Sequence, residues 1–178
     1  MTQANRRVLY VIVCAAGPAS HVQEFVTLAQ AALWDVCVIP TPHAVPFMDI
    51  PLLTELTDHE VRSDYSPSKN GESLPLCDAI VVVAATFNTV NKFAGGIADT
   101  RALTILCENF GRGRPILVVP CVNENHLARH PAFRKSLATL QQWGVHILYD
   151  LEKYPPRNDV PWNTVLATLH QVVEGAGL

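Results

Sequence analysis

Residues 78–100 read DAIVVVAATFNTVNKFAGGIADT, an apolar run that gives way abruptly to small and polar side chains. The run at 78–83 is almost entirely hydrophobic and mostly β-branched, as expected for a strand buried on both faces of a parallel sheet. Residues 87–93 then have the spacing of a short helix, which Gly95 and Gly96 end. A buried strand followed directly by a helix is the repeating unit of an α/β fold.

The same alternation of strand and helix continues along the chain in both directions. Further strands are predicted at residues 7–14, 36–39, 115–119 and 145–148. Helices are predicted at residues 19–33, 50–56, up to 109 after an Asp99 N-cap, within 127–143 starting at Pro131, and from Pro161 onward. The polar stretch 58–76 predicts an exposed loop, and residues 174–178 predict a frayed tail.

This pattern predicts a three-layer, doubly wound α/β fold, Rossmann-like or flavodoxin-like, with helices on both faces of a parallel sheet. We expect residues 1–178 to form a single domain that stands alone, because no linker or repeat interrupts the alternation. The start of the chain allows one alternative, since Arg6 and Arg7 followed by VLYVIVCAA are similar to a signal peptide. We favour a strand, because the apolar run is short, β-branched and followed at once by an amphipathic pattern.

Composition narrows the classes of function. The chain has 178 residues, of which 49% are hydrophobic and 16% charged, and its net charge is −3. That charge gives no electrostatic basis for binding nucleic acid, and no apolar stretch is long enough to span a membrane. Five cysteines without a CxxC pair argue against a metal site and favour a reducing, cytoplasmic compartment. The low charge also suggests buried contacts between subunits.

Ligands of such folds bind beyond the carboxyl ends of the strands, which directs attention to four loops. In the first, AAGPAS, we expect Gly17 to permit a tight turn and Ala19 and Ser20 to begin a helix whose free N–H groups suit a phosphate. The alternative is a plain capped helix. In the second, PTPHAVPF, Thr41 lies just past the strand. His43, in this loop, and His59 are candidate bases whose ordinary alternative is a surface histidine.

The third loop is the stretch quoted at the outset, and the fourth is PCVNENHLARHPAF. Ala84, Ala85 and Thr86 leave room for a flat ligand to approach the backbone. Asn88 has a donor and an acceptor that could hold a carboxylate or a ring edge, although it could instead be an N-cap for a helix at Thr89. The fourth loop is long and polar, so it either closes over a ligand or only connects two elements.

Two motifs in these loops carry a family resemblance. AATFNT at residues 84–89, followed by Lys92 and then GIAD at 96–99, is similar to the signature Pro-Ala-Ser-Ala-Asn-Thr with its downstream Lys and Gly-Ile-x-Asp. PCVNENHL at 120–127 matches in part the signature Pro-x-Met-Asn-x-x-Met-Trp. The chain thus resembles the flavoprotein family of homo-oligomeric flavin-containing cysteine decarboxylases, which includes phosphopantothenoylcysteine decarboxylases and the peptidyl-cysteine decarboxylases of lantibiotic-type biosynthesis.

The resemblance implies a cofactor, a site and an assembly. It implies FMN, oxidative decarboxylation of a cysteine carboxylate, and homotrimers or multiples of trimers with each flavin at a subunit interface. Asn88 would contact both flavin and substrate carboxylate and so is the candidate catalytic residue, and Asn123 would belong to a substrate clamp. The implied cofactor-binding residues are Gly17, Ala19, Ser20, Thr41, Thr86 and Asn88.

The sequence departs from the family pattern at several positions, and one of these departures, a missing histidine, keeps a second function open. Ala84 stands where the signature has proline. The family also has a His in a His-x-Glu-Leu segment before the third strand, and the matching residue here is Asn70, which cannot take up a proton at neutral pH. His59 could replace it only if the loop folds back. The alternative is therefore an FMN-binding protein without this activity: a flavin reductase or modifier, or a non-catalytic oligomer partner.

Overall fold

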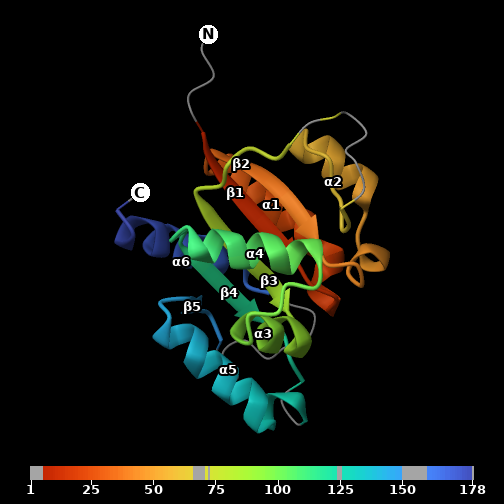
Figure 1. Cartoon of the computed structure of the whole chain (residues 1–178). Coiled ribbons are helices and arrows are strands. Elements are labelled where there is room, and N and C mark those ends of the chain that lie inside the picture. Colours follow the sequence, from red (N-terminus) through yellow and green to blue (C-terminus); the bar gives the residue numbers. More distant parts are fainter. Residues whose placement is uncertain (1–5, 66–70, 72, 124–125, 150–159, 178) are drawn as a thin grey trace.

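A computed structural model describes residues 6–65, 71, 73–123, 126–149 and 160–177 of the chain (Figure 1). The strands are β1 (Arg7–Val13), β2 (Trp34–Pro40), β3 (Ala79–Ala85), β4 (Ile116–Pro120) and β5 (His146–Ile147). The α-helices are α1 (Val22–Ala31), α2 (Ile50–Thr57), α3 (Phe87–Ala94), α4 (Arg101–Gly111), α5 (Pro131–Gln142) and α6 (Trp162–Gly175). Short 3-10 helices are η1 (Gly17–His21), η2 (Val45–Phe47) and η3 (Leu127–Arg129).

The strands form one parallel sheet in the order β2-β1-β3-β4-β5. Every residue of the central strand β3 is buried, which explains its unbroken apolar sequence. The first strand begins at Arg7, so the strand interpretation of the N-terminal apolar run is confirmed. This strand order is that of flavodoxin-like folds, and the predicted doubly wound α/β class is confirmed.

Helices cover both faces of the sheet and bury a separate core on each. On one face, α1, α2 and α6 contribute Phe25, Leu53 and Leu169, all fully or almost fully buried. On the other face, α3, α4 and α5 contribute to a second cluster of buried side chains, which includes Phe93, Leu106, Phe133 and Leu140. Figure 1 shows α4 crossing this second face. The result is the predicted three-layer arrangement.

The central strand has a β-bulge near its carboxyl end. Val82 pairs with Val118, but the next paired residue, Ala85, lies opposite Pro120, so β3 carries one extra residue here. Ala84 adopts a left-handed conformation with φ of 53° although it is fully buried. Ala85 consequently joins the core of the second face, whereas strict alternation along the strand would direct it to the first.

Three predicted boundaries differ from the observed ones. Thr100, not Asp99, is the N-cap of α4, since its side chain accepts a hydrogen bond from the Leu103 N–H. Asp99 instead pairs with Lys92 Nζ at 2.6 Å. The first helix is preceded by η1, so α1 covers less of the predicted range 19–33. The last helix continues to Gly175, so the first two residues of the predicted frayed tail, 174 and 175, are helical.

The segment that follows α2 is in part the exposed loop predicted over 58–76, since Asp64, Tyr65 and Leu76 are exposed. Val61 is buried, and the Arg62 carbonyl accepts a hydrogen bond from Arg101 Nη1 at 2.8 Å. Cys77, just before β3, is buried and its thiol donates to Asn109 Oδ1 at 3.3 Å. The chain is therefore held against α4 at Arg62 and again at Cys77, which the polar composition of the segment did not indicate. Residues 66–70 and 72 lie outside the described part of the chain.

Candidate active site at the carboxyl edge

The carboxyl ends of the strands place four loops along one edge of the sheet, which we call the carboxyl edge. These loops are residues 14–20, 41–47, 84–89 and the described residues of 120–130. The Cys14 N–H donates to the Val83 carbonyl at 3.2 Å, and the Thr41 N–H donates to the Val13 carbonyl at 2.8 Å. The first three loops therefore leave the sheet side by side, at the switch point where β1 separates β2 from β3.

The first loop forms the 3-10 turn η1 before α1 begins. Pro18 and Ala19 are buried, whereas Gly17 and Ser20 are exposed. The Ser20 hydroxyl donates to the Gly17 carbonyl at 2.9 Å, and the first turn contains no acidic side chain. The predicted regular helix start at Ala19 is thus a tighter turn, which presents one exposed hydroxyl and no negative charge.

The second loop places Thr41 directly beside the first. Thr41 is half-buried, and its carbonyl accepts a hydrogen bond from the Ala44 N–H at 2.9 Å. No described residue bonds to its hydroxyl, which stays available at the edge. His43, in the same turn, is exposed.

The third loop turns into α3, and Thr86 rather than Asn88 is its N-cap. Thr86 Oγ1 accepts from the Thr89 N–H at 3.4 Å and lies 3.2 Å from Thr89 Oγ1. The capping alternative for Asn88 is therefore wrong. Asn88 lies in the first turn of α3 with an exposed side chain, and no described residue hydrogen-bonds its amide. This leaves both its donor and its acceptor available to a ligand.

A buried thiol supports this loop from below. Burial raises the pKa of Cys14 to about 11, although hydrogen bonds with the Thr89 side chain and the Thr86 backbone oppose that shift. Cys14 therefore joins the end of β1 to the start of α3 as a neutral group. Its sequence context, a strand of apolar residues, gave no sign of this contact with the candidate site.

The fourth loop lies next to the third, because the Cys121 N–H donates to the Ala85 carbonyl at 2.8 Å. Asn123, the predicted clamp residue, is exposed. Its Oδ1 lies 3.3 Å from His126 Nδ1, and its carbonyl accepts from the Ala128 N–H at 3.0 Å. Residues 124–125 lie outside the described part of the chain.

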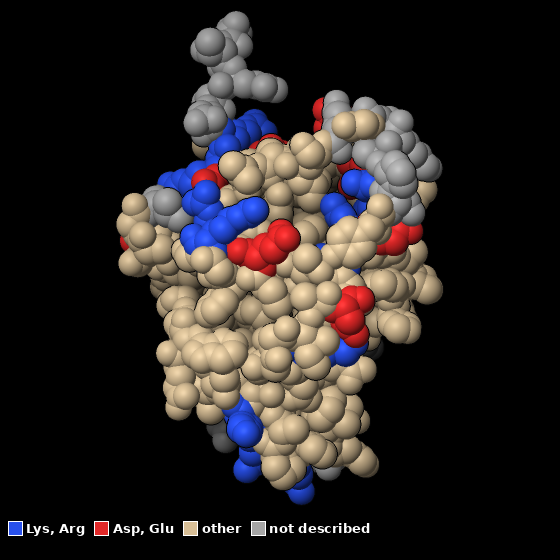
Figure 2. Space-filling view, in the orientation of Figure 1, with Lys and Arg blue, Asp and Glu red and all other residues tan. Residues whose placement is uncertain are grey.

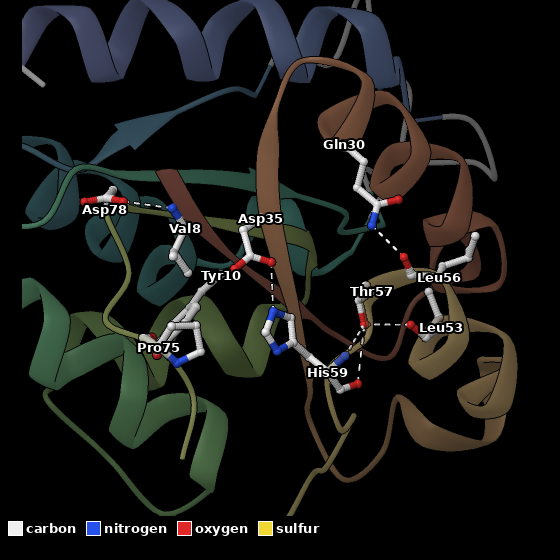
Figure 3. Close-up of polar contacts among 10 residues, drawn as sticks. All are labelled: Val8, Tyr10, Gln30, Asp35, Leu53, Leu56, Thr57, His59, Pro75 and Asp78. Atoms are coloured by element: carbon white, nitrogen blue, oxygen red, sulfur yellow. Dashed lines mark hydrogen bonds and ion pairs between the residues drawn. The ribbon is translucent and has the colours of Figure 1, made fainter. Parts of the chain in front are cut away.

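His59 lies at the opposite, amino edge of the sheet. Its Nε2 lies 2.8 Å from Asp35 Oδ1 (Figure 3), and Asp35 is the second residue of β2. Its backbone N–H is also bound, to Thr57 Oγ1 at 3.3 Å. The loop does not fold back toward the carboxyl edge at this point, so His59 cannot stand in for the missing family histidine. Asn70, the matching position, is outside the described residues.

The amino edge also contains a hollow of about 1180 Å³, beside the contacts drawn in Figure 3. Its lining includes Arg7, Trp34, Asp35, His59 and His170. These groups are engaged with one another: the Arg7 guanidinium lies 5.7 Å from the Trp34 ring centroid, and Trp34 Nε1 donates to His170 Nε2 at 3.3 Å. Apart from the candidate base His59, none of the predicted site residues lies among them.

Comparison with known proteins establishes the family. The family model described as Flavoprotein matches residues 2–174. The chain belongs to this family. A curated relative, the coenzyme A biosynthesis bifunctional protein CoaBC of Bacillus subtilis (strain 168), is 32% identical over 133 residues. That match covers 71% of this chain but 32% of the relative, so the chain spans about a third of that protein's length.

Solved structures agree with this assignment at the level of the fold. The FMN-dependent cysteine decarboxylase TvaF from thioviridamide biosynthesis has a TM-score of 0.75 and 22% identity, covering 96% of this chain and 99% of its own. HAL3 from Cryptococcus neoformans has a TM-score of 0.79 and 17% identity, covering 97% and 98%. Family and neighbours together support the predicted cofactor, FMN.

The residues of the carboxyl edge fit an anionic, aromatic cofactor. Hydroxyl groups of Ser20 and Thr41 lie in neighbouring loops of this edge, and neither η1 nor α3 has an acidic residue in its first turn, which suits an anion. Small side chains at Ala84 and Ala85 end the central strand.

In the described part of the chain, no helix is long and apolar enough to cross a membrane.

Proposed function

We propose that this protein binds FMN at the carboxyl edge and catalyses the oxidative decarboxylation of a cysteine carboxylate, on a peptide or a related thiol. The observation that carries the proposal is the exposed, unpaired amide of Asn88 at the switch point, presented by a helix that Thr86 caps. The match of residues 2–174 to the Flavoprotein family and the decarboxylases among its structural neighbours support it.

In this proposal each loop has a separate task. The η1 turn, with Gly17, Ala19 and Ser20, holds the phosphate, and Thr41 adds a hydroxyl beside it. Thr86 lies along the flavin ring. Asn88 donates a hydrogen bond to the substrate carboxylate, and the loop that carries Asn123 holds the remainder of the substrate. We therefore assign a catalytic role to Asn88 and a substrate-binding role to Asn123.

The reaction balances as a two-electron oxidation followed by loss of CO₂. FMN, when bound, supplies the two-electron acceptor. The substrate loses the thiol proton and a hydride from the carbon that bears sulfur, which leaves a thioaldehyde. The bond between the α-carbon and the carboxylate then breaks, and its electron pair moves toward the C=S group to give an enethiolate. The protein must remove a proton and hold the carboxylate so that this bond can break.

The alternative is an FMN-binding protein without decarboxylase activity. It is favoured by Asn70 at the position of the family histidine and by the placement of His59 at the amino edge. Such a protein would reduce or modify flavin, or serve as a non-catalytic partner in an oligomer. The substitution Asn70→His separates the two: if the alternative holds because only this histidine is missing, the variant should gain an activity that the parent lacks.

A homotrimer, or a multiple of trimers, is part of the proposal. Exposed apolar side chains include Phe47, Ile97, Leu127 and Trp143. Figure 2 shows few charged side chains over the middle of the face that carries α3 and α4. Uncharged surface of this kind favours contacts between subunits. Native mass spectrometry should report three chains or a multiple of three; a monomer would contradict this part.

The first test is the colour of the purified protein. A bound flavin gives absorption near ~450 nm through its own ring system. The holoprotein should then convert a peptide with a C-terminal cysteine to a product lighter by one CO₂ and two hydrogen atoms. A colourless protein that does not take up added FMN would overturn both functions. A yellow protein that is inactive on free cysteine, on peptides that end in cysteine and on N-acylated cysteines with a free thiol would leave only the alternative function.

A further inference from the structure

The substrate clamp of this chain contains a histidine at a signature position. Counted from Pro120 through PCVNENHL, the pattern Pro-x-Met-Asn-x-x-Met-Trp places its first Met at Val122 and its second at His126. The chain thus lacks the histidine expected at position 70 but has one within the clamp, three residues after Asn123. A proton acceptor is the one function that neither Asn88 nor Asn123 can supply.

Asn123 orients the imidazole of His126. Its Nδ1 lies 3.3 Å from Asn123 Oδ1, and its backbone N–H donates to the Asn123 carbonyl at 3.4 Å. With the Asn123 amide oriented as the structure assigns it, Oδ1 can only accept, so Nδ1 carries the proton. In the neutral ring, Nε2 then holds a lone pair. His126 is exposed, and no described residue hydrogen-bonds its Nε2.

His130, four residues on, has the opposite arrangement. Its Nδ1 accepts a hydrogen bond from the Ala132 N–H at 3.1 Å and caps α5. Nε2 therefore carries the proton in the neutral ring, and Nε2 cannot accept a proton from a substrate. Its ring lies edge-on to that of Phe87, with the two centroids 5.4 Å apart. His130 is a structural residue, although it lies in the same loop.

The other histidines are less suited to the role, and one of them, His146, is exposed at the amino end of β5. His59 and His170 are engaged at the amino edge, with Asp35 and Trp34 respectively. His21 lies 3.6 Å from Glu24 on the exposed side of α1. His43 lies at the carboxyl edge, but no described side chain fixes its ring. A base needs a partner that holds it in one tautomer, and His126 has such a partner within the clamp.

We propose that His126 is the base that removes the thiol proton of the substrate; this rests on the proposed decarboxylase function. The S–H bond breaks, and its electron pair stays on sulfur while the proton moves to Nε2. This leaves a thiolate and an imidazolium. The same clamp loop then binds the substrate, through Asn123, and activates it, through His126. Asn123 is also the positioning residue that sets the tautomer of the base.

The first experiment compares His126→Gln with His130→Gln on the FMN-loaded protein and a cysteine-ended peptide. Loss of a general base lowers kcat by about 100- to 10,000-fold, so we expect a fall of this size for H126Q, with KM and FMN content near those of the parent. H130Q should lower the melting temperature through loss of the α5 cap and keep kcat close to that of the parent. Added imidazole should rescue His126→Gly, and Asn70→His should restore activity to H126Q.

An active parent whose H126Q variant keeps the parent kcat would overturn the assignment of His126 alone. A parent inactive on every thiol substrate would overturn the proposed function together with this assignment. NMR correlation of ring nitrogens and protons tests the geometry without cofactor or turnover, with signals assigned by their loss in H126Q and H130Q. We expect the proton on Nδ1 in His126 and on Nε2 in His130; a proton on Nε2 in His126 would remove the structural basis of the inference.

Discussion

The two edges of the sheet hold polar groups in different states of pairing. At the amino edge, the Asp35 carboxylate lies 2.8 Å from His59, and the Asp78 carboxylate accepts a hydrogen bond from the Val8 N–H at 2.8 Å (Figure 3). At the carboxyl edge, the amide of Asn88 and the hydroxyl of Thr41 have no hydrogen-bond partner among the described residues. The amino edge also contains the hollow of about 1180 Å³, so a hollow by itself does not mark the candidate site.

The difference shows that the pairing of polar groups, rather than the presence of a hollow, separates a structural polar cluster from a candidate site. Groups that satisfy one another, as at the amino edge, have little left to offer a ligand. Polar groups without a hydrogen-bond partner, beside small side chains, can bind a ligand with little reorganisation of the protein. The parallel topology gives the physical reason, since it directs the loops and helix starts of the switch point to the carboxyl edge.

The largest expected effect comes from the open amide at the carboxyl edge. Asn88→Ala should lower kcat by about 100- to 1,000-fold, the usual result of removing one well-placed hydrogen-bond donor, and should weaken FMN binding by a much smaller factor. The matched control is Asn91→Ala on the same helix, because Asn91 Oδ1 accepts from the Ser136 hydroxyl at 2.7 Å and is structural. Steady-state kinetics and flavin titration check this. Equal losses of kcat in both variants would break the comparison.

The bulge at Ala84 gives the next effect, this time on stability. Ala84→Pro restores the residue of the family signature, but proline cannot adopt a φ of 53°. We expect the free energy of unfolding to fall by about 3 kcal/mol or more. Ala84→Gly should keep it close to the parent value, because glycine tolerates the left-handed conformation.

Ala79→Gly is the control for this pair, since Ala79 is buried at the amino end of the same strand with no left-handed conformation. It should lose about 1 kcal/mol as an ordinary glycine within a strand. Denaturant unfolding of the three variants ranks them. A proline variant as stable as the parent would show that β3 reaches the carboxyl edge without the bulge.

A smaller effect is expected at the η1 turn. Ser20→Ala removes a hydroxyl that could donate to the FMN phosphate, and loss of one such hydrogen bond is worth about 1 kcal/mol, or roughly a fivefold weaker affinity. kcat at saturating FMN should not change. Thr27→Ala is the control, because the Thr27 hydroxyl is likewise bound to a backbone carbonyl, that of Gln23, at 2.9 Å but on the exposed side of α1. Fluorescence titration with FMN measures both, and equal affinity in S20A and the parent would remove Ser20 from the phosphate site.

Hydrophobic pattern alone could predict the architecture. Apolar runs identified all five strands, and the alternation with helices set the parallel topology and therefore the edge where ligands bind. The ends of helices were harder to predict where two neighbouring residues could both serve as the N-cap. Asp99 and Thr100 are both good N-caps, and only the backbone path decides that Thr100 is used.

The remaining features depend on contacts that sequence patterns do not contain. The bulge at Ala84 depends on how β3 pairs with β4. An alanine within an apolar run does not indicate a left-handed backbone conformation. The pair formed by Asp35 and His59 joins β2 to the segment after α2, so His59 was a plausible base until its partner was known. Cys14 contacts the start of α3 only because β1 and β3 are neighbours.

The smallest expected effect tests the amino edge itself. His59→Gln and Asp35→Asn each break the 2.8 Å contact, whose side chains are 23% and 36% exposed, and a pair so open to solvent contributes about 0–1 kcal/mol. FMN affinity and kcat should stay at the parent values in both, because the pair lies at the far end of the strands from Thr86 and Asn88. The double variant should lose no more stability than either single one, since either change removes the same contact. A large loss of kcat in H59Q at normal FMN content would place chemistry at the amino edge, and the pairing criterion that separates the two edges would then fail.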